Sequence, residues 1–233
     1  MSDETIMPFD FQSGSPSIIK VIGVGGGGGN AVNHMYREGI HDVTFVVCNT
    51  DNQALDESPV PIKLQLGREG LGAGNRPERA RDAANESLED VKNMLNDGCK
   101  MAFITAGMGG GTGTGAAPII AKTAKDMGIL TVGVVTKPFK FEAKQRMNNA
   151  IGGIEKLKES VDTLIVIPND KLLEIVDRRT TMPDALKKAD EVLQQAVQGI
   201  TDLINVPGLI NLDFADVQTV MKDKGIAHIG IGN

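Results

Sequence analysis

Residues 106–115 read Ala106-Gly-Met-Gly-Gly-Gly-Thr-Gly-Thr-Gly115, a run dominated by glycine. The apolar run just before it, residues 101–105, predicts a buried strand, and residues 116–127 after it have helical composition. Pro118 falls near the start of the predicted helix, where a proline is tolerated. The stretch is therefore predicted to be a glycine-rich loop that joins a strand to a helix.

A loop of this kind is suited to binding an anion. Glycines let the backbone turn tightly and approach a ligand without a Cβ in the way. The peptide N–H groups of the loop and the positive end of the helix dipole together favour phosphate. Thr112 and Thr114 add hydroxyl groups that can donate to phosphate oxygens or reach a bound Mg²⁺. The alternative is a flexible surface linker, but such linkers are rarely flanked so tightly by a strand and a helix.

A second junction of the same kind comes earlier in the chain. A strand predicted at residues 18–22 is followed by Gly23-Val-Gly-Gly-Gly-Gly-Gly29 and by a helix predicted at residues 31–37. Alone, this run matches the GxGxxG pattern of dinucleotide-binding domains, with Asp51 after the strand predicted at residues 43–48 as the ribose acid. So dense a glycine run satisfies that pattern by default. A dinucleotide needs one such loop, so two loops favour one triphosphate held from two sides. The sequence contains no GxxxxGKS or GxxxxGKT motif, which excludes an ordinary P-loop.

A third glycine-bearing loop, residues 67–74, follows a possible edge strand at residues 62–66. Pro77 then opens a polar helix expected to run to about residue 96. The loop can cover the terminal phosphate of a bound nucleotide. The local sequence is equally compatible with a plain loop that leads into the helix.

The order of these elements predicts the fold class. Further strands are expected at residues 130–135 and 163–167, so strands alternate with helices along the chain. This alternation predicts an α/β fold, a Rossmann-like parallel sheet with helices on both faces and right-handed connections. Ligands of such sheets bind at the carboxyl ends of the strands, where all three glycine loops are expected to lie.

Three polar residues are expected at the same edge. Glu142 and Arg146 are four apart at the start of a helix predicted at residues 142–160, and Asn169 follows the last strand. A glutamate can accept from ribose hydroxyls, and an arginine can face phosphate or ribose. The alternative for Glu142 and Arg146 is an ordinary surface ion pair.

A long helix is predicted at residues 183–205, with a wide apolar stripe at helical period. Asp190 lies in its first turns, near the expected nucleotide edge. A carboxylate there can accept two hydrogen bonds from the N1–H and the exocyclic amine of guanine, a pair that adenine does not offer. Asn30 or Asn169 can complete the recognition of the base. The alternative for Asp190 is an acid that is favoured only by the helix dipole.

Acidic residues follow the long helix. Asp213 and Asp216 are three apart, and Asn211 comes just before them. Such a group can polarise a water or hold a hydrated Mg²⁺. Ordinary N-capping of a short helix, with Asp216 in a capping-box role, is the alternative. The long helix leads away from the nucleotide edge, so these acids are expected on the opposite side. There they can act on the nucleotide of a second molecule stacked head to tail, in a contact that builds a filament.

The composition narrows the class of protein. The chain has 233 residues and a net charge of −6, which does not suggest a nucleic-acid partner. Cys48 and Cys99 show no CxxC spacing and are interpreted as buried, reduced thiols, and no signal peptide is apparent. Residues 101–121 carry no charge, but their glycines and Pro118 make a membrane helix implausible. We expect a cytoplasmic protein without direct membrane insertion, and a disordered tail at residues 1–16.

Five motifs in this order resemble the tubulin/FtsZ family. They are the run Gly23–Asn30, Cys48-Asn-Thr-Asp51, the signature loop at residues 106–115, Ile167-Pro-Asn-Asp170, and Gly208-Leu-Ile-Asn-Leu-Asp-Phe-Ala-Asp216. The resemblance covers the chain from about residue 18 to its end. It implies binding and hydrolysis of GTP, head-to-tail polymerisation, and formation of the bacterial division ring at midcell, with other division proteins as partners. The expected ligands are GTP or GDP and Mg²⁺, with no protein ligand assigned to the metal.

The loops and the resemblance together define a predicted site. The nucleotide-binding residues are Gly26, Gly27, Gly28, Gly29, Asn30, Gly74, Gly107, Gly110, Gly111, Thr112, Gly113, Glu142, Arg146, Asn169 and Asp190. The catalytic residues are Asn211, Asp213 and Asp216, which are expected to activate hydrolysis across the contact between subunits.

The sequence departs from the family pattern in two places. Leu186 stands one helical turn before Asp190, where many members have an aromatic residue, so guanine affinity is expected to be weaker. The apolar run 228–233 is interpreted as the first strand of a second domain that is missing. We therefore expect a GTP-binding domain at residues 17–205 and a segment at 206–233 with the acidic loop, a helix and that strand, in a chain with weak turnover. An NAD-dependent oxidoreductase is the alternative function, and a filament protein without turnover is a third.

Overall fold

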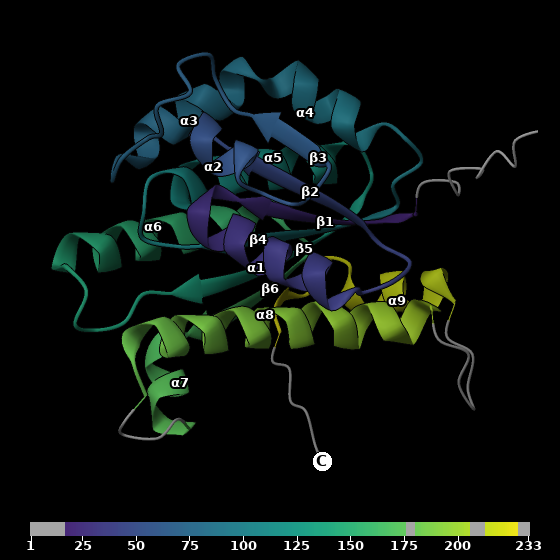
Figure 1. Ribbon diagram of the computed structural model, residues 1–233. Helices are drawn as coiled ribbons and strands as arrows, with labels where there is room; N and C mark the ends of the chain where they lie inside the picture. The colour runs from purple at the N-terminus through teal and green to yellow at the C-terminus, as the bar shows by residue number, and fades with distance from the viewer. Residues whose placement is uncertain (1–16, 176–179, 206–212, 228–233) are drawn as a thin grey trace, which may run out of the picture.

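A computed structural model describes residues 17–175, 180–205 and 213–227. They form one parallel sheet of seven strands in the order β3-β2-β1-β4-β5-β6-β7, with helices packed around it (Figure 1). The strands are β1 (Ile19–Val24), β2 (Thr44–Asn49), β3 (Ile62–Gln65), β4 (Met101–Gly107), β5 (Leu130–Lys137), β6 (Thr163–Pro168) and β7 (Gly225–Ile226). The predicted fold class, a parallel α/β sheet, is confirmed.

Helices cover both faces of the sheet because successive strand residues point to opposite faces. Ile22 and Val24 of β1 face one apolar core, and Ile19 and Val21 face the other. The first core is closed by α3 (Pro77–Glu86), α4 (Leu88–Leu95), α5 (Thr112–Asp126) and α6 (Lys144–Ser160). The second is closed by α1 (Gly25–Glu38), α2 (Asn52–Asp56), α7 (Asn169–Ile175), α8 (Met182–Asn205) and α9 (Phe214–Met221).

The topology brings the two glycine-rich junctions together. Strands β1 and β4 are neighbours in the sheet, although β2 and β3 separate them in the chain. The order of the strands reverses between β1 and β4, and in doubly wound sheets a ligand crevice opens outside the carboxyl ends at such a point. Because α1 follows β1 and α5 follows β4, both helices begin at this crevice.

Several predicted boundaries are wrong, and tertiary packing explains two of them. Helix α1 begins at Gly25, inside the glycine run, rather than at residue 31. A Cβ on Gly28 would lie 2.2 Å from the carbonyl oxygen of Thr105, so glycine lets this turn of α1 press against β4. Helix α5 likewise begins at Thr112 rather than at residue 116. Low helix propensity is overridden at both places because the packing requires the absence of a side chain.

Other elements differ for local reasons. The helix expected at residues 77–96 is two helices, because Ser87 interrupts it and its hydroxyl accepts from the N–H of Gly67. Glu142 lies before α6, which starts at Lys144, so the expected start of this helix is also wrong. Three elements, α2, α7 and β7, were not predicted from the sequence because they are too short to show a period. The predicted edge strand β3 and the long helix α8 are confirmed. The predictions for residues 1–16, Asn211 and residues 228–233 lie outside the described residues.

Candidate functional site

The two glycine loops touch each other at the carboxyl end of the sheet. Gly25 has a φ of +72°, and a Cβ built on it would lie 2.7 Å from the backbone nitrogen of Gly113. A Cβ on Gly27 would lie 3.0 Å from the Cα of Gly107. The amino ends of α1 and α5 are therefore adjacent, and both present the N–H groups of a first helical turn at one crevice.

The third loop, residues 67–74, packs against the signature loop. A Cβ on Gly111 would lie 2.1 Å from the carbonyl oxygen of Gly74. The hydroxyl groups of Thr50 and Thr112 are hydrogen-bonded, with 2.7 Å between the two oxygens. The loop lies beside the signature loop and also leads into α3, so both alternatives, a cover over the terminal phosphate and a plain helix-entry loop, fit this placement.

A pocket of about 430 Å³ opens at this edge, between the glycine loops, the start of α6 and the first half of α8. Its volume is within the ordinary range for a site that binds a small molecule or cofactor. The pocket is lined by Gly27, Asn30, Gly107, Met108, Thr136, Pro138, Phe139, Phe141, Glu142, Arg146, Asn169, Leu186, Ala189, Asp190 and Leu193. Residues from five different parts of the chain thus converge on one cavity.

Two hydrogen-bond acceptors in this pocket are partly or fully withdrawn from solvent. Burial raises the pKa of the Asp190 carboxyl to about 6, and the negative charge of Glu191 adds to the shift. The Asn169 side chain is 6% exposed, and its Oδ1 makes no hydrogen bond within the described structure. A desolvated carboxylate and an unsatisfied amide oxygen are costly unless a ligand supplies donors. The pocket is therefore prepared for a ligand with N–H or O–H groups at these positions.

The expected ion pair is present at the mouth of the pocket. Arg146 Nε lies 3.1 Å from Glu142 Oε2, while Glu142 Oε1 accepts from the N–H of Phe139 at 3.0 Å. The backbone hydrogen bond fixes the glutamate beside the cavity. Both the structural and the ligand-binding interpretation of the pair fit this geometry.

Two aromatic rings in the pocket were not among the predicted site residues. Phe139 and Phe141 are stacked, with centroids 4.9 Å apart and planes at 13°. Phe139 is buried, and Phe141 is 58% exposed. The signal available in the sequence was a pair of aromatics in an otherwise aromatic-poor chain, directly before Glu142.

Asp51 has a structural role. Its carboxylate caps α2 by accepting from the N–H groups of Gln53, at 3.0 Å, and Ala54, at 3.4 Å. A dinucleotide-binding domain would use an acid after β2 to bind a ribose. Because this carboxylate is already hydrogen-bonded to the backbone, the main residue offered for the dinucleotide alternative is engaged elsewhere.

Asp213 and Asp216 lie at the other end of the sheet. Helix α9 packs beside the amino ends of the strands, away from the glycine loops (Figure 1). The two acids form a reciprocal capping box: Asp213 Oδ1 accepts from the N–H of Asp216, and Asp216 Oδ2 accepts from the N–H of Asp213. Both residues are exposed. The capping alternative is therefore present, and the acids remain accessible to a second molecule.

The structure separates the predicted nucleotide-binding residues into two groups. Gly27, Asn30, Gly107, Glu142, Arg146, Asn169 and Asp190 line the pocket itself. The others, on the three adjacent loops, are Gly26, Gly28, Gly29, Gly74, Gly110, Gly111, Thr112 and Gly113. Within this second group, Gly28, Gly111 and Gly113 are buried in contacts with neighbouring backbone. Their ligand contacts stay predictions.

The fold and this crevice define a doubly wound α/β domain of the nucleotide-binding class. Residues 18–177 match the model of the Tubulin/FtsZ family, GTPase domain. The chain therefore belongs to the tubulin/FtsZ family, as the sequence motifs indicated.

Solved structures agree with this assignment. An FtsZ dimer from M. jannaschii, described as empty, is 47% identical with a TM-score of 0.85, and the match covers 92% of this chain and 63% of that one. The W319Y mutant of M. jannaschii FtsZ is 48% identical with a TM-score of 0.84, covering 89% and 63%. CetZ2 from Haloferax volcanii, a protofilament bound to GTPγS, has a TM-score of 0.74 at 22% identity and covers 89% and 64%, which shows a shared fold. This chain thus spans less than two thirds of each of these proteins.

Two kinds of feature are absent from the described residues. No helix among them combines the length and apolar character needed to cross a bilayer. In the same residues, no group of three or more His, Cys, Asp or Glu side chains is arranged to hold a metal ion.

Proposed function

We propose that this chain is the GTP-binding part of a cytoskeletal GTPase that polymerises head to tail. The observation that carries the proposal is one pocket that joins two helix amino ends to the half-buried carboxylate of Asp190 and the unsatisfied amide oxygen of Asn169. The helix ends suit phosphates, and the acceptors suit a base edge that offers two donors. Guanine has such an edge and adenine does not.

Each part of the pocket has a separate task in this proposal. The Asp190 carboxylate accepts from guanine N1–H and the exocyclic amine, and Asn30 or Asn169 completes the recognition of the base. Glu142 and Arg146 contact the ribose and a phosphate, and the signature loop holds the phosphates through its N–H groups and the Thr112 hydroxyl. Mg²⁺, held mainly by phosphate oxygens and water, would neutralise charge on the phosphates.

Hydrolysis is proposed to need a second subunit. Asp213 and Asp216 are exposed at the opposite end of the sheet from the pocket, so they cannot reach the nucleotide bound to their own chain. In a head-to-tail stack, the acids of one subunit face the nucleotide of the next and orient the attacking water. Asn211 is proposed to assist them. The CetZ2 protofilament bound to GTPγS supports a polymer of this kind.

The cellular role follows from the FtsZ neighbours as a proposal. We infer a protein of the cytoplasm that assembles a division ring at midcell, together with other division proteins. Residues 17–205 form the nucleotide-binding domain in this proposal, and residues 206–233 supply the acids. The present chain spans 63% of the M. jannaschii FtsZ chains. We propose that it binds nucleotide well and turns it over poorly, because turnover needs the acids of a second subunit.

A nucleotide panel tests the proposal. Isothermal calorimetry should show that the chain binds GTP and GDP more tightly than ATP and NAD by at least tenfold. Asp190→Asn should lower GTP affinity by about 100-fold, because the neutral amide oxygen keeps at most one of the two hydrogen bonds and the amide NH₂ faces the exocyclic amine of guanine. The same variant should gain affinity for xanthosine triphosphate, whose 2-oxygen accepts from the new amide.

The control is Glu191→Gln, the next residue along α8. Glu191 is paired with Lys188 at 2.7 Å and does not line the pocket. Its substitution should leave GTP affinity within twofold. Tight binding of NAD with indifference to guanine would instead support the dinucleotide-dependent oxidoreductase. Binding of GTP with unchanged hydrolysis in Asp213→Ala of the full-length protein would support a filament protein without this catalytic mechanism.

A further inference from the structure

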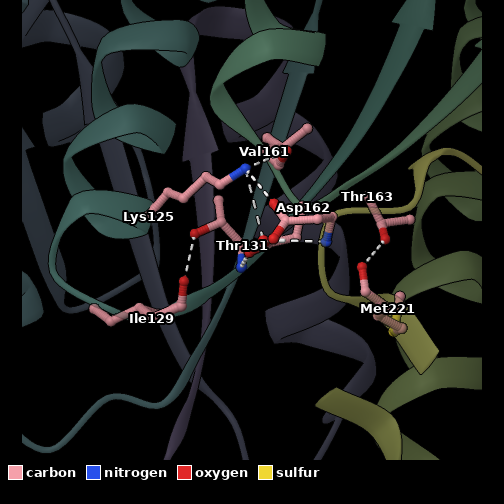
Figure 2. A network of polar contacts seen from close by, with 8 residues as sticks. Lys125, Ile129, Thr131, Val161, Asp162, Thr163 and Met221 are labelled. Atoms are coloured by element: carbon pink, nitrogen blue, oxygen red, sulfur yellow. Dashed lines mark hydrogen bonds and ion pairs between the residues drawn. The ribbon is translucent and has the colours of Figure 1, made fainter. Parts of the chain in front are cut away.

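A buried carboxylate lies at the amino end of the sheet, far from the nucleotide pocket. Asp162 directly precedes β6 and is 3% exposed. Its Oδ2 accepts from the N–H of Thr131 at 2.9 Å, and its Oδ1 accepts from the N–H of Asp223 at 3.4 Å. Figure 2 shows Asp162 between Thr131 of β5 and the segment that follows α9. One side chain therefore joins the central sheet to the last described segment of the chain.

A lysine from α5 completes the cluster. Lys125 Nζ lies 3.7 Å from Asp162 Oδ1 and 2.8 Å from Asp223 Oδ1, and it donates to the carbonyl oxygen of Val161 at 3.3 Å. The hydrogen bond to Asp223 raises the pKa of Lys125, and the charge of Asp162 adds to the shift. The ammonium group compensates the buried charge of Asp162, which would otherwise be costly.

The cluster fixes the turn between α9 and β7. The Asp162 carbonyl oxygen accepts from the N–H groups of Lys224, at 2.9 Å, and Gly225, at 3.1 Å. One residue further, the Thr163 hydroxyl donates to the carbonyl oxygen of Met221 at 2.5 Å. Asp223 itself adopts a φ of 53°, a conformation that non-glycine residues seldom adopt. These bonds hold the carboxyl end of α9 against the start of β6.

Apolar packing gives α9 little additional support. Within the described part of α9, Val217 is buried, while Phe214 and Met221 are partly buried at the edge of the core. The strand that follows, β7, has two residues. A short helix with so few buried contacts owes its position largely to the polar cluster at its end.

Helix α5 links this cluster to the phosphate loop. Its 15 residues begin at Thr112 in the signature loop and end at Asp126, next to Lys125. A helix of that length spans roughly 22 Å. Helix α5 therefore carries Lys125 of the cluster at one end and the signature loop at the other.

We propose that Asp162, together with Lys125 and Asp223, forms a positioning set that fixes where α9 presents Asp213 and Asp216 to the nucleotide of the next subunit. This inference rests on the proposed function of those two acids. The three residues touch neither nucleotide, so they are positioning residues and not catalytic ones. Their substitution should impair the acids a subunit offers and leave the pocket of that subunit intact.

The test uses the full-length protein with Asp162→Ala. GTP affinity of the unassembled protein should stay within twofold, and filaments should still sediment. GTP turnover per polymerised subunit should fall by about tenfold. Asp162→Asn, which keeps one acceptor for Thr131 or Asp223, should recover part of that loss. Asp126→Asn is the matched control, because Asp126 lies at the same end of α5 in an exposed pair with Lys122, and it should change turnover by less than twofold.

Mixed filaments distinguish a positioning role from a general loss of structure. Asp162→Ala subunits keep an intact pocket, and Asp190→Ala subunits keep intact acids. A mixture of these two variants should therefore restore turnover. Mixing with Asp213→Ala subunits, whose acids are impaired, should restore nothing. Recovery in both mixtures or in neither would overturn the proposal, as would a parallel loss of GTP affinity.

Variants of Asp223, Asp213 and Asp216 separate a failure of this inference from a failure of the proposed function. If Asp162→Ala does not fold, the exposed Asp223→Ala decides, with an expected loss of turnover of about threefold at unchanged GTP affinity. If Asp213→Ala abolishes turnover while the positioning variants retain it, this inference fails and the proposed function stands. If Asp213→Ala and Asp216→Ala both retain full turnover, the proposed function of the acids fails instead.

Discussion

The two ends of the parallel sheet differ in how complete their sites are. At the carboxyl end, loops from several parts of the chain enclose a pocket of about 430 Å³ with desolvated acceptors. At the amino end, Asp213 and Asp216 are exposed, and among the described residues their carboxylates are hydrogen-bonded only within their own capping box. The carboxyl end thus forms a pocket within one chain, whereas the acids of the amino end lie on an open surface.

The difference has a physical origin in the fold. Helices that follow parallel strands begin at the carboxyl end of the sheet, so their positive dipole ends gather there and favour phosphate. Their negative ends gather at the amino end, which is unfavourable for a triphosphate. In the proposed function, acids at the amino end serve catalysis only when another subunit supplies the nucleotide, so the two ends are proposed to be complementary halves of one site.

The first prediction tests this division of labour and has the largest expected effect. In the full-length protein, Asp213→Ala and Asp216→Ala should each lower GTP turnover by about 100-fold or more, because the water loses the group that orients it. GTP affinity should not change, since the acids lie at the opposite end of the sheet. A coupled phosphate-release assay and calorimetry on the same samples measure the two quantities.

Filaments that mix two variants test directly whether the two ends form a shared site. Asp213→Ala subunits offer an intact pocket, and Asp190→Ala subunits offer intact acids. In random filaments of equal parts, about a quarter of the subunits hold nucleotide against an intact acid face, so turnover should return to about a quarter of the wild-type rate. Full activity of the single variant, or a mixture as inactive as its parts, would show that the two ends do not form a shared site.

Much of the carboxyl end could be predicted from the sequence because its signals are local. The glycine runs follow apolar strands directly, and the parallel sheet places every such junction at one edge. The long-range pairing of β1 with β4, which makes Gly25 touch Gly113, has no local signal. The roles of individual glycines were also hidden, since Gly28 packs against Thr105 while Gly26 faces open space, and the sequence shows the same letter for both.

The amino end was less predictable because its contacts are distant in sequence. Asp162 appears in the sequence as a lone acid before an apolar run, and its partners Thr131 and Asp223 come from elements far away along the chain. Strand β7 has no hydrophobic period, because it forms by pairing two residues with β6. The reciprocal capping of Asp213 and Asp216 was accessible from their spacing, and the structure contains it.

The second prediction concerns the pH dependence of GDP binding in the pocket at the carboxyl end. In the proposed function, guanine recognition needs the Asp190 carboxylate, whose pKa is raised to about 6 by burial. GDP affinity should therefore fall as the pH is lowered through 6, by about tenfold at pH 5 relative to pH 7.5. Phosphate groups titrate in the same range, so the profile of Asp190→Asn serves as the reference, and the ratio of the two profiles isolates Asp190.

Stability of the nucleotide-free protein should change in the opposite direction. A carboxyl whose folded-state pKa lies above its unfolded value takes up a proton on folding between about pH 4 and pH 6. The free energy of unfolding should therefore be higher below this window and should decrease as the pH rises through it. Asp190→Asn should remove this dependence in chemical denaturation. A wild-type protein with a flat affinity ratio and a flat stability profile would show that the carboxyl is not desolvated.

The third prediction has the smallest effect and tests how well the pocket fits its base. Leu186 lines the pocket one helical turn before Asp190 and is 48% exposed. A base stacked on an aromatic ring gains about 1–3 kcal/mol relative to alanine, and leucine already supplies part of that contact. Leu186→Phe should therefore raise GDP affinity by about threefold in calorimetry. Leu203→Phe is the control: Leu203 is similarly exposed near the far end of α8, where a new ring should not alter binding. Equal affinities for all three proteins would show that the base does not lie over this turn of α8, and that the ring of Phe141 or an edge of the pocket away from α8 contacts it instead.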